Sequence, residues 1–359
     1  MRALPAWVSW LAVARLRRSD CSGPGITRRR RGKGFQFLDE DGRAITEPSV
    51  VERIHELAIP PAWKEVWICP YPMGHIQATG TDAAGRKQYR YHERWRQRRD
   101  AEKFDEMLDF ARTLPILRER VARDLAADDM SRERVLACAA RLLDRGFFRI
   151  GSESYAEEND TYGLATMKKR HVLIDGTRVQ FDYEAKGGQK RMQSVVDPGV
   201  AEVVERLKRR RSGIDELLAY KEGRRWRDVK SADINDYVKE VTGGDFSAKD
   251  FRTWGATVLA AWFLALTGQA SGARTARKRV QTRVVKDVAR LLGNTPAVCR
   301  SSYIDPRVFD RHDGGLVIAG ATDLLVEAEG GWPEIQPTVE RAVIALIEDE
   351  RSPVLERIV

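Results

Sequence analysis

The spacing of apolar residues changes near residue 100, and this change limits the possible folds more than any other feature of the chain. Before it, strand-like runs such as Phe35–Leu38 alternate with turn residues such as Asp41-Gly42. Beyond it, apolar residues such as Phe104 and Leu108 recur at the spacing of an amphipathic helix. The sequence therefore predicts a small β-rich domain followed by a larger, mainly α-helical domain.

Each predicted domain also contains a segment of the other type of secondary structure. A single helix is expected at about 50–57 within the β-rich part. Within the helical part, three strands are expected at 166–174, 177–184 and 191–196, because Gly-containing turns separate these runs. Helices are expected again from Pro198 to the end of the chain. The fold class is thus α+β, with a three-stranded β insert in the helical domain.

The first 33 residues give the weakest structural indication. Residues 2–14 imitate a secretion signal, but the arginines that follow favour a frayed extension or a start codon placed too far upstream. The run of four arginines at 28–31 is either a solvated tail or a tether to phosphate groups. We expect a disordered basic extension at 1–33, a β-rich domain at 34–100 and the helical domain at 101–359.

Charge and cysteine content narrow the possible functions. Lys and Arg number 62 against 53 Asp and Glu, and this net charge of +9 suits a protein that meets a polyanion. The four cysteines form no CxxC pair and the five histidines lack metal-ligand spacing, so we expect a reduced, intracellular protein without metal or other cofactor. No phosphate-binding GxxxxGK[ST] loop is present, and the apolar stretch at 255–268 is too short to span a membrane.

A junction between two predicted helices brings an asparagine and a tyrosine into the same region. An apolar stripe that ends at Leu292 predicts one helix, which Gly293 terminates. Thr295-Pro296 opens the next helix as its N-cap and first turn, so Asn294 falls in the tight junction. Tyr303 is expected about two turns along the second helix. Because helix N-termini attract phosphate groups, this junction is a candidate phosphate site beside a tyrosine hydroxyl.

Three basic residues are candidates for the same site, although an ordinary structural role is the alternative for each of them alone. Ser247 and Asp250 form a predicted capping box, which puts Arg252 near the start of a helix, where a phosphate is a better partner than the helix dipole. Arg149 lies between apolar residues and a glycine, so it is either buried in an ion pair or directed at a site. Lys186 stands at the tip of a predicted Gly-Gly hairpin, exposed and able to reach a substrate.

With these residues in place, the chain resembles the type IB DNA topoisomerases of the poxvirus and bacterial kind. The resemblance runs from about Gly34 to about Val308. It rests on the stretches GRKQYRY at 85–91, FRIG at 148–151, NDTYGL at 159–164, Lys186-Gly187, KDFRTWG at 249–255, and LGNTP at 292–296 followed by Ser302-Tyr303. Each stretch is weak alone, but their combined order is specific. The larger domain is then expected to be a catalytic domain of the tyrosine recombinase and topoisomerase IB type.

The resemblance implies a chemical role for five residues. Tyr303 matches the nucleophile that becomes joined to a DNA 3′ end, and this bond conserves the energy for rejoining without ATP. Arg149 and Arg252 match the arginines that hold the nonbridging phosphate oxygens, in place of a metal ion. Lys186 matches the general acid that protonates the 5′ oxygen. Asn294 stands where poxvirus members carry His, and it can donate a hydrogen bond but carries no charge.

The resemblance also implies contacts with double-stranded DNA. In the β-rich domain, residues of the GRKQYRY stretch match those that reach bases or phosphates, although a half-exposed strand with ordinary aromatic packing is the alternative. Two further residues in the catalytic domain match phosphate or minor-groove contacts. The six candidates are Arg86, Gln88, Tyr89, Tyr91, Tyr155 and Lys249. We expect a monomer that closes around the duplex, acts at the nucleoid in the cytoplasm, and has no membrane partner.

Two other functions compete with DNA relaxation. A site-specific tyrosine recombinase shares the catalytic residues, but the β-rich front domain and the absence of an evident exchange helix argue against it. A DNA-binding protein without activity is disfavoured by the complete catalytic set. The basic stretch at 271–283 is either a flexible linker or the start of a DNA-gripping helix, and the tail after Arg311 shows helical spacing suited to capping the core.

Overall fold

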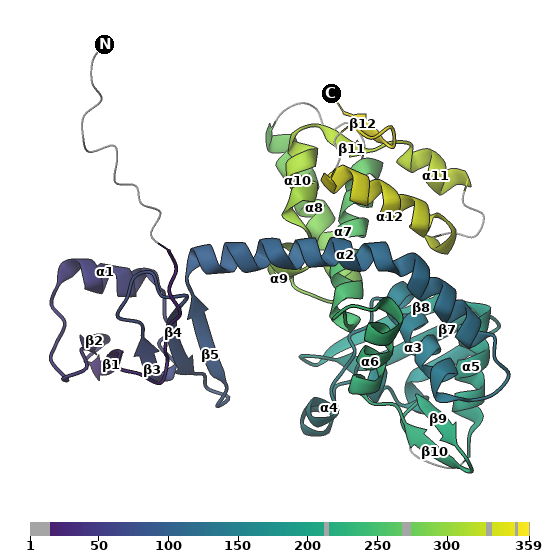
Figure 1. Ribbon diagram of the computed structural model, residues 1–359, viewed down its shortest axis with the longest axis horizontal. Helices are drawn as coiled ribbons and strands as arrows, with labels where there is room; N and C mark the ends of the chain where they lie inside the picture. Colours follow the sequence, from purple (N-terminus) through teal and green to yellow (C-terminus); the bar gives the residue numbers. More distant parts are fainter. Residues whose placement is uncertain (1–14, 212–214, 268–273, 328–331, 349–350, 359) are drawn as a thin grey trace. The chain divides into compact units, whose positions relative to one another are not determined.

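The computed structural model describes residues 15–211, 215–267, 274–327, 332–348 and 351–358 (Figure 1). Contacts between residues divide the chain into two compact units, Met1–Lys103 and Phe104–Val359. The division falls inside one long helix, α2 (Glu93–Leu125). It lies within three residues of the boundary expected from the change in apolar spacing.

Over its described residues, from 15 onward, the first unit is an antiparallel sheet of five strands with one helix. The strand order is β2-β1-β3-β4-β5, so β2 and β5 are the edge strands. Its elements are β1 (Ile26–Arg31), β2 (Gly34–Leu38), α1 (Pro48–Glu56), β3 (Lys64–Ile68), β4 (Ile76–Thr81) and β5 (Lys87–Tyr91). Ile54 of α1 packs with Ile26, Phe37 and Ile68 in a small apolar core. The expected strands and the single helix are confirmed here.

The basic segment before residue 33 is part of this sheet, so the expectation of disorder is wrong from residue 15 onward; residues 1–14 lie outside the described part. Residues 27–31 of β1 pair with β2, and Ile26 and Thr27 also pair with β3, so the strand finds backbone partners whatever its side chains carry. Ile26 is buried, and Arg28 donates to the carbonyls of Pro60 and Trp63 at 3.1 and 2.8 Å. Strand pairing and the hydrogen bonds of Arg28 therefore hold this segment in the sheet despite the repulsion among its arginines.

The second unit is mainly helical, and its described residues form three small sheets. Its elements after α2 are α3 (Arg132–Gly146), α4 (Glu153–Asn159), the 3₁₀ turns η2 (Leu164–Thr166) and η3 (Lys169–His171), β6 (Val172–Asp175), β7 (Arg178–Ala185), β8 (Gln189–Val196), α5 (Pro198–Arg209), β9 (Ala219–Glu222), β10 (Arg225–Asp228), α6 (Ser231–Thr242), α7 (Ala248–Leu266), α8 (Arg274–Leu292), α9 (Pro296–Ser302), α10 (Pro306–Asp313), β11 (Leu316–Ile318), α11 (Ala321–Glu327), α12 (Trp332–Glu348) and β12 (Leu355–Arg357).

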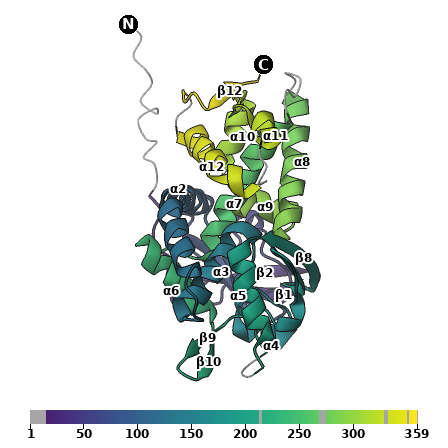
Figure 2. The same cartoon turned by 90° about the vertical axis from the view of Figure 1, so that its right-hand side faces the viewer.

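Helix α7 forms the centre of this unit. Most of its side chains are buried, as expected for a helix that is apolar on all sides. It packs against α3, α8, α10 and α12, and Figures 1 and 2 show these last three helices gathered around it with β11 and β12. The expected helix in the tail, α12, buries Val339, Ala342, Val343 and Leu346 against this core. None of the helices that the structure describes combines the length and apolar character needed to cross a bilayer.

The β insert differs from the expectation at its start. The segment before Val172 forms two short 3₁₀ turns instead of a strand, because Leu164 and Ala165 donate to the carbonyls of Arg149 and Ile150 and are drawn into the core. The expectation of helices alone after Pro198 is also wrong, since β9 pairs with β10 and β11 pairs with β12. The β7–β8 hairpin is confirmed, with strict alternation of buried and exposed residues along β7.

Candidate active site

The junction between α8 and α9 has the predicted capping geometry. Gly293 follows α8 with φ of +64°, a conformation that suits glycine, and the amide of Asn294 donates to the carbonyl of Ala289 at 2.9 Å. Thr295 caps α9 by accepting from the amide of Val298 at 3.3 Å. Tyr303 lies directly after the last residue of α9 and not within the helix as expected. Asn294 and Tyr303 therefore bracket one short helix.

Two of the predicted arginines converge on the C-terminal end of α8, although they come from different parts of the unit. Arg149 donates to the carbonyl of Gly293 at 2.6 Å and to Oδ1 of Asn294. Arg252 donates to the carbonyl of Leu292 at 2.9 Å and to that of Phe147. The last carbonyls of a helix lack partners within the helix. These arginines supply the missing donors and are fixed in place by doing so.

Arg252 is the more deeply buried of the two arginines. Only 4% of its surface is exposed, and its guanidinium carbon lies 5.3 Å from the centre of the Tyr303 ring. Burial lowers the pKa of Arg252 to about 10, and the nearby charge of Arg149 acts in the same direction. The side chain still carries its charge at neutral pH.

Two hydrogen-bond donors in this cluster have no partner among the described residues. They are Nε of Arg252 and Nδ2 of Asn294, and both are buried. An unsatisfied buried donor costs about 1–3 kcal/mol, so such atoms are uncommon without a reason. Among the residues described, neither Arg149 nor Arg252 forms an ion pair with a carboxylate. The cluster thus offers positive charge and open donors beside a tyrosine ring.

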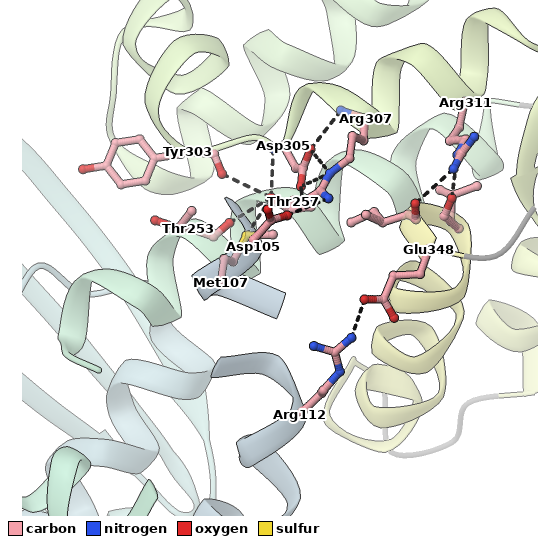
Figure 3. Close-up of polar contacts among 12 residues, drawn as sticks. Asp105, Met107, Arg112, Thr253, Thr257, Tyr303, Asp305, Arg307, Arg311 and Glu348 are labelled. Carbon is pink, nitrogen blue, oxygen red and sulfur yellow. Dashed lines mark hydrogen bonds and ion pairs between the residues drawn. The ribbon is translucent and has the colours of Figure 1, made fainter. Parts of the chain in front are cut away.

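The backbone of Tyr303 is held by a buried polar network (Figure 3). The hydroxyl of Thr257 lies 3.2 Å from the carbonyl of Tyr303 and accepts from the amide of Asp305 at 3.1 Å. The carboxylate of Asp305 caps α10 and pairs with Arg307 at 2.8 Å. Figure 3 shows the Tyr303 ring directed away from these contacts, and the ring is half-buried. The network therefore fixes the main chain and leaves the phenol outside it.

The remaining predicted residues of the catalytic domain lie in three places. Lys186 is exposed at the tip of the β7–β8 hairpin, where Gly187 has φ of +82°, as expected for this turn. Lys249 is exposed in the first turn of α7, where Asp250 accepts from the amide of Ser247 at 2.8 Å. Tyr155 belongs to α4, but its side chain lies outside the described residues. The hydrogen-bonded cluster itself consists of the two arginines and the α8–α9 junction.

Comparisons with known proteins show the family of the chain. Residues 92–311 match the family of the eukaryotic DNA topoisomerase I catalytic core, and residues 34–82 match the bacterial DNA topoisomerase IB N-terminal domain. The DNA topoisomerase 1B of Acanthamoeba polyphaga mimivirus is 32% identical over 290 residues, which cover 78% of this chain and 85% of that protein. The chain belongs to the type IB DNA topoisomerases.

More distant relatives match smaller shares of the sequence. DNA topoisomerase 1 of Rabbit fibroma virus is 22% identical over 241 residues, or 66% of this chain and 73% of the viral protein. DNA topoisomerase 1 alpha of Arabidopsis thaliana is 26% identical over 161 residues, or 44% of this chain and 16% of the plant protein. As a type IB topoisomerase, the chain is a DNA-binding isomerase with the expected α+β fold. The recombinase alternative finds no support in these matches.

In this topoisomerase the four candidate DNA contacts of the first unit lie at and after one turn. Tyr89 and Tyr91 are 43% and 47% exposed on the same face of β5, with their rings stacked at 6.0 Å. Asp82 accepts from Gln88 at 2.9 Å and pairs with Arg86 at 2.9 Å. Two exposed tyrosines on an edge strand leave their rings open to a partner, whereas Arg86 and Gln88 are already engaged by one carboxylate.

A further arginine, which the sequence did not predict, reaches the same helix end. Arg191 of β8 donates to the carbonyls of Arg290 and Leu291 at 3.0 and 2.6 Å. It is therefore a third arginine on the last turn of α8, beside Arg149 and Arg252. Its position in an alternating strand gave no indication of this contact, because the partner carbonyls lie about 100 residues further along the chain.

Proposed function

We propose that this topoisomerase relaxes supercoiled DNA with Tyr303 as the nucleophile. The phenolic oxygen attacks a backbone phosphorus, the bond to the 5′ oxygen breaks, and the strand remains attached through its 3′ phosphate. Attack by the released 5′ hydroxyl reverses the step and restores Tyr303. Because the phosphotyrosyl ester retains the energy of the broken bond, ATP is not required.

One observation supports this proposal above the others: the two unpartnered donors beside the Tyr303 ring. Nε of Arg252 and Nδ2 of Asn294 are buried without a partner among the described residues. A phosphate at the α8–α9 junction would offer both of them an acceptor oxygen. Bonds between an arginine and a phosphate are charge-assisted and stronger than neutral ones. The donors are thus explained by a ligand that is an oxyanion.

Arg149 and Arg252 are proposed to stabilise the transition state. Charge builds on the nonbridging oxygens as the phosphorus is attacked, and fixed cations in a buried site stabilise that charge without reorganising. The carbonyls of Leu292 and Gly293 hold the two guanidinium groups before DNA arrives. These cations take the part that a divalent metal takes in other phosphoryl transfers, so we propose a metal-independent reaction.

Asn294 is proposed to contribute a neutral hydrogen bond. Its Oδ1 accepts from Arg149, which leaves the Nδ2 group as the end available to a phosphate oxygen. A side-chain amide has no proton to give at neutral pH, so the proton for the leaving group must come from elsewhere. We assign that proton to Lys186, whose exposed position at a hairpin tip permits it to approach the departing 5′ oxygen.

The DNA contacts and the assembly are further parts of the proposal. Tyr89 and Tyr91 would contact the duplex from the first unit, and Lys249 would contact a phosphate from α7. The two compact units joined through α2 would act as a monomer that closes around DNA. Since the substrate would be chromosomal, we propose that the protein works at the nucleoid in the cytoplasm.

Relaxation of a negatively supercoiled plasmid in EDTA, without ATP, tests this proposal. Wild-type protein should relax the plasmid and Tyr303→Phe should not, while the variant binds the same duplex within a few-fold. Denaturation during the reaction should trap wild-type protein covalently attached to the 3′ phosphate end of the cleaved strand. Relaxation by Tyr303→Phe would refute the nucleophile. Cleavage that needs paired recognition sites would indicate a recombinase instead.

A further inference from the structure

Arg191 connects the hairpin that carries Lys186 to the junction that carries Asn294. It lies five residues after Lys186 on β8, directly across from Tyr183 of β7, and two pairs of residues separate it from the hairpin turn. At about 3.4 Å per residue, that places it roughly 7–10 Å from the tip. Its two terminal nitrogens donate to the carbonyls of Arg290 and Leu291 at 3.0 and 2.6 Å.

The guanidinium of Arg191 also covers Gly293. A Cβ at Gly293 would lie 2.8, 2.9 and 3.0 Å from Nη1, Cζ and Nε of Arg191, so the flat group rests on the glycine backbone. Gly293 is followed by Asn294, and its carbonyl accepts from Arg149. The contact therefore reaches the peptide that holds one catalytic arginine and precedes the phosphate-binding amide.

The same hairpin is anchored a second time within the core. The hydroxyl of Tyr183 donates to Oε1 of Gln193 at 2.5 Å, and Gln193 donates to the carbonyl of Gly146 at the end of α3. This second anchor ties the hairpin to the end of α3 and not to a carbonyl of α8. Arg191 is thus a side chain of this hairpin that donates directly to carbonyls at the end of α8.

We infer that Arg191 is a positioning residue that aligns Lys186 with the phosphate site. The inference rests on the proposed function, in which Lys186 is the general acid. Both terminal nitrogens of Arg191 are engaged by carbonyls. Unlike Arg252 and Asn294, Arg191 has no buried unpartnered donor among the described residues, so it lacks the feature that points to a phosphate. An arginine suits the task because its fork reaches two successive carbonyls, whereas a lysine offers a single point of contact. A misplacement of about 1 Å in a catalytic group can slow a reaction about 100-fold.

Leaving-group replacement separates alignment of the acid from other roles. Single-turnover cleavage is measured on a duplex with the ordinary 5′ oxygen and on one with a 5′ sulfur, which leaves without a proton. We expect Arg191→Ala to cleave the oxygen substrate about 10- to 100-fold slower than wild type and the sulfur substrate at nearly the wild-type rate. Arg191→Lys should show a smaller loss with the same rescue. Arg178→Ala, an exposed arginine of the same sheet, is the matched control and should cleave both like wild type.

Lys186→Ala distinguishes the two possible failures. Rescue of Lys186→Ala by sulfur, with equal losses on both substrates for Arg191→Ala, would overturn the positioning role and leave the proposed function intact. No rescue of Lys186→Ala would refute Lys186 as the acid and overturn this inference with it. On the oxygen substrate, the double variant should be no slower than Lys186→Ala alone. An additive loss would also contradict alignment through Arg191. Urea unfolding of each variant confirms that the comparison is made on folded protein.

Discussion

Replacing Gly293 with alanine tests the close packing of the Arg191 guanidinium on the end of α8. The first cost is conformational, because φ of +64° is a left-handed conformation that costs an L residue about 1–2 kcal/mol. The second is steric, since the new Cβ would lie 2.8 Å from Nη1 of Arg191 and the guanidinium must move. Moving it weakens two hydrogen bonds, each worth about 0.5–1.5 kcal/mol, and partial exposure to water reduces this value. We therefore expect Gly293→Ala to lower the free energy of unfolding by about 2–3 kcal/mol.

Gly176 provides a matched control in the same unit. It has φ of +56° in the turn between β6 and β7, and nothing lies within 4 Å of the position of an added Cβ. Gly176→Ala should therefore carry the conformational cost alone, about 1–2 kcal/mol. The difference between the two variants, about 1 kcal/mol, reports the displacement of Arg191.

Urea unfolding and single-turnover cleavage together make the test. Gly293→Ala should unfold at lower urea than Gly176→Ala with the same slope, and should also cleave more slowly. Gly176→Ala should cleave like wild type, because its turn lies at the opposite end of β7 from Lys186. Equal losses of stability in the two variants, with normal cleavage by Gly293→Ala, would refute the reasoning.

Three further substitutions test other parts of the site. Asn294→Asp keeps the acceptor for Arg149 but replaces the open donor with a negative oxygen, so single-turnover cleavage should fall by about 100-fold or more and below that of Asn294→Ala. Thr257→Val should lower the free energy of unfolding in urea by about 1–3 kcal/mol, because the carbonyl of Tyr303 and the amide of Asp305 lose their partner. Thr257→Ser keeps the hydroxyl and should unfold like wild type. Glu340→Gln removes one of two buried carboxylates that pair with Arg118, and its calorimetric unfolding should show a loss of about 2 kcal/mol.

The parts of the site that sequence predicted well are those fixed by local rules. A glycine after an apolar stripe and a Thr-Pro pair define the end of α8 and the start of α9, whatever surrounds them. The Gly-Gly turn likewise identifies the hairpin tip that carries Lys186. The predicted position of Tyr303 within a helix was wrong, because α9 ends at Ser302 and the chain then leads into α10. The end of that helix depends on the buried Thr257 contact, which spacing does not reveal.

Features that depend on tertiary contacts were not predictable in the same way. The arginine run of β1 has the composition of a tail, yet it pairs with β2, and the residues before it pair with β3; such pairing partners cannot be deduced from charge. Arg191 has the alternation of an ordinary strand residue, and only the fold brings α8 beneath it. The roles of single residues came from the resemblance to a known family. Composition alone indicated only that the protein binds a partner of negative charge.

The C-terminal end of α8 explains how three arginines can lie together without carboxylates. The carbonyls of residues 290–293 accept from Arg191, Arg252 and Arg149. A helix C-terminus carries roughly half a negative charge, so it orients three guanidinium groups while most of their charge stays uncompensated. A carboxylate would hold an arginine as firmly, but it would cancel a full charge and occupy the fork that a phosphate needs. A helix end is therefore a better support than a carboxylate for arginines that must bind a phosphate.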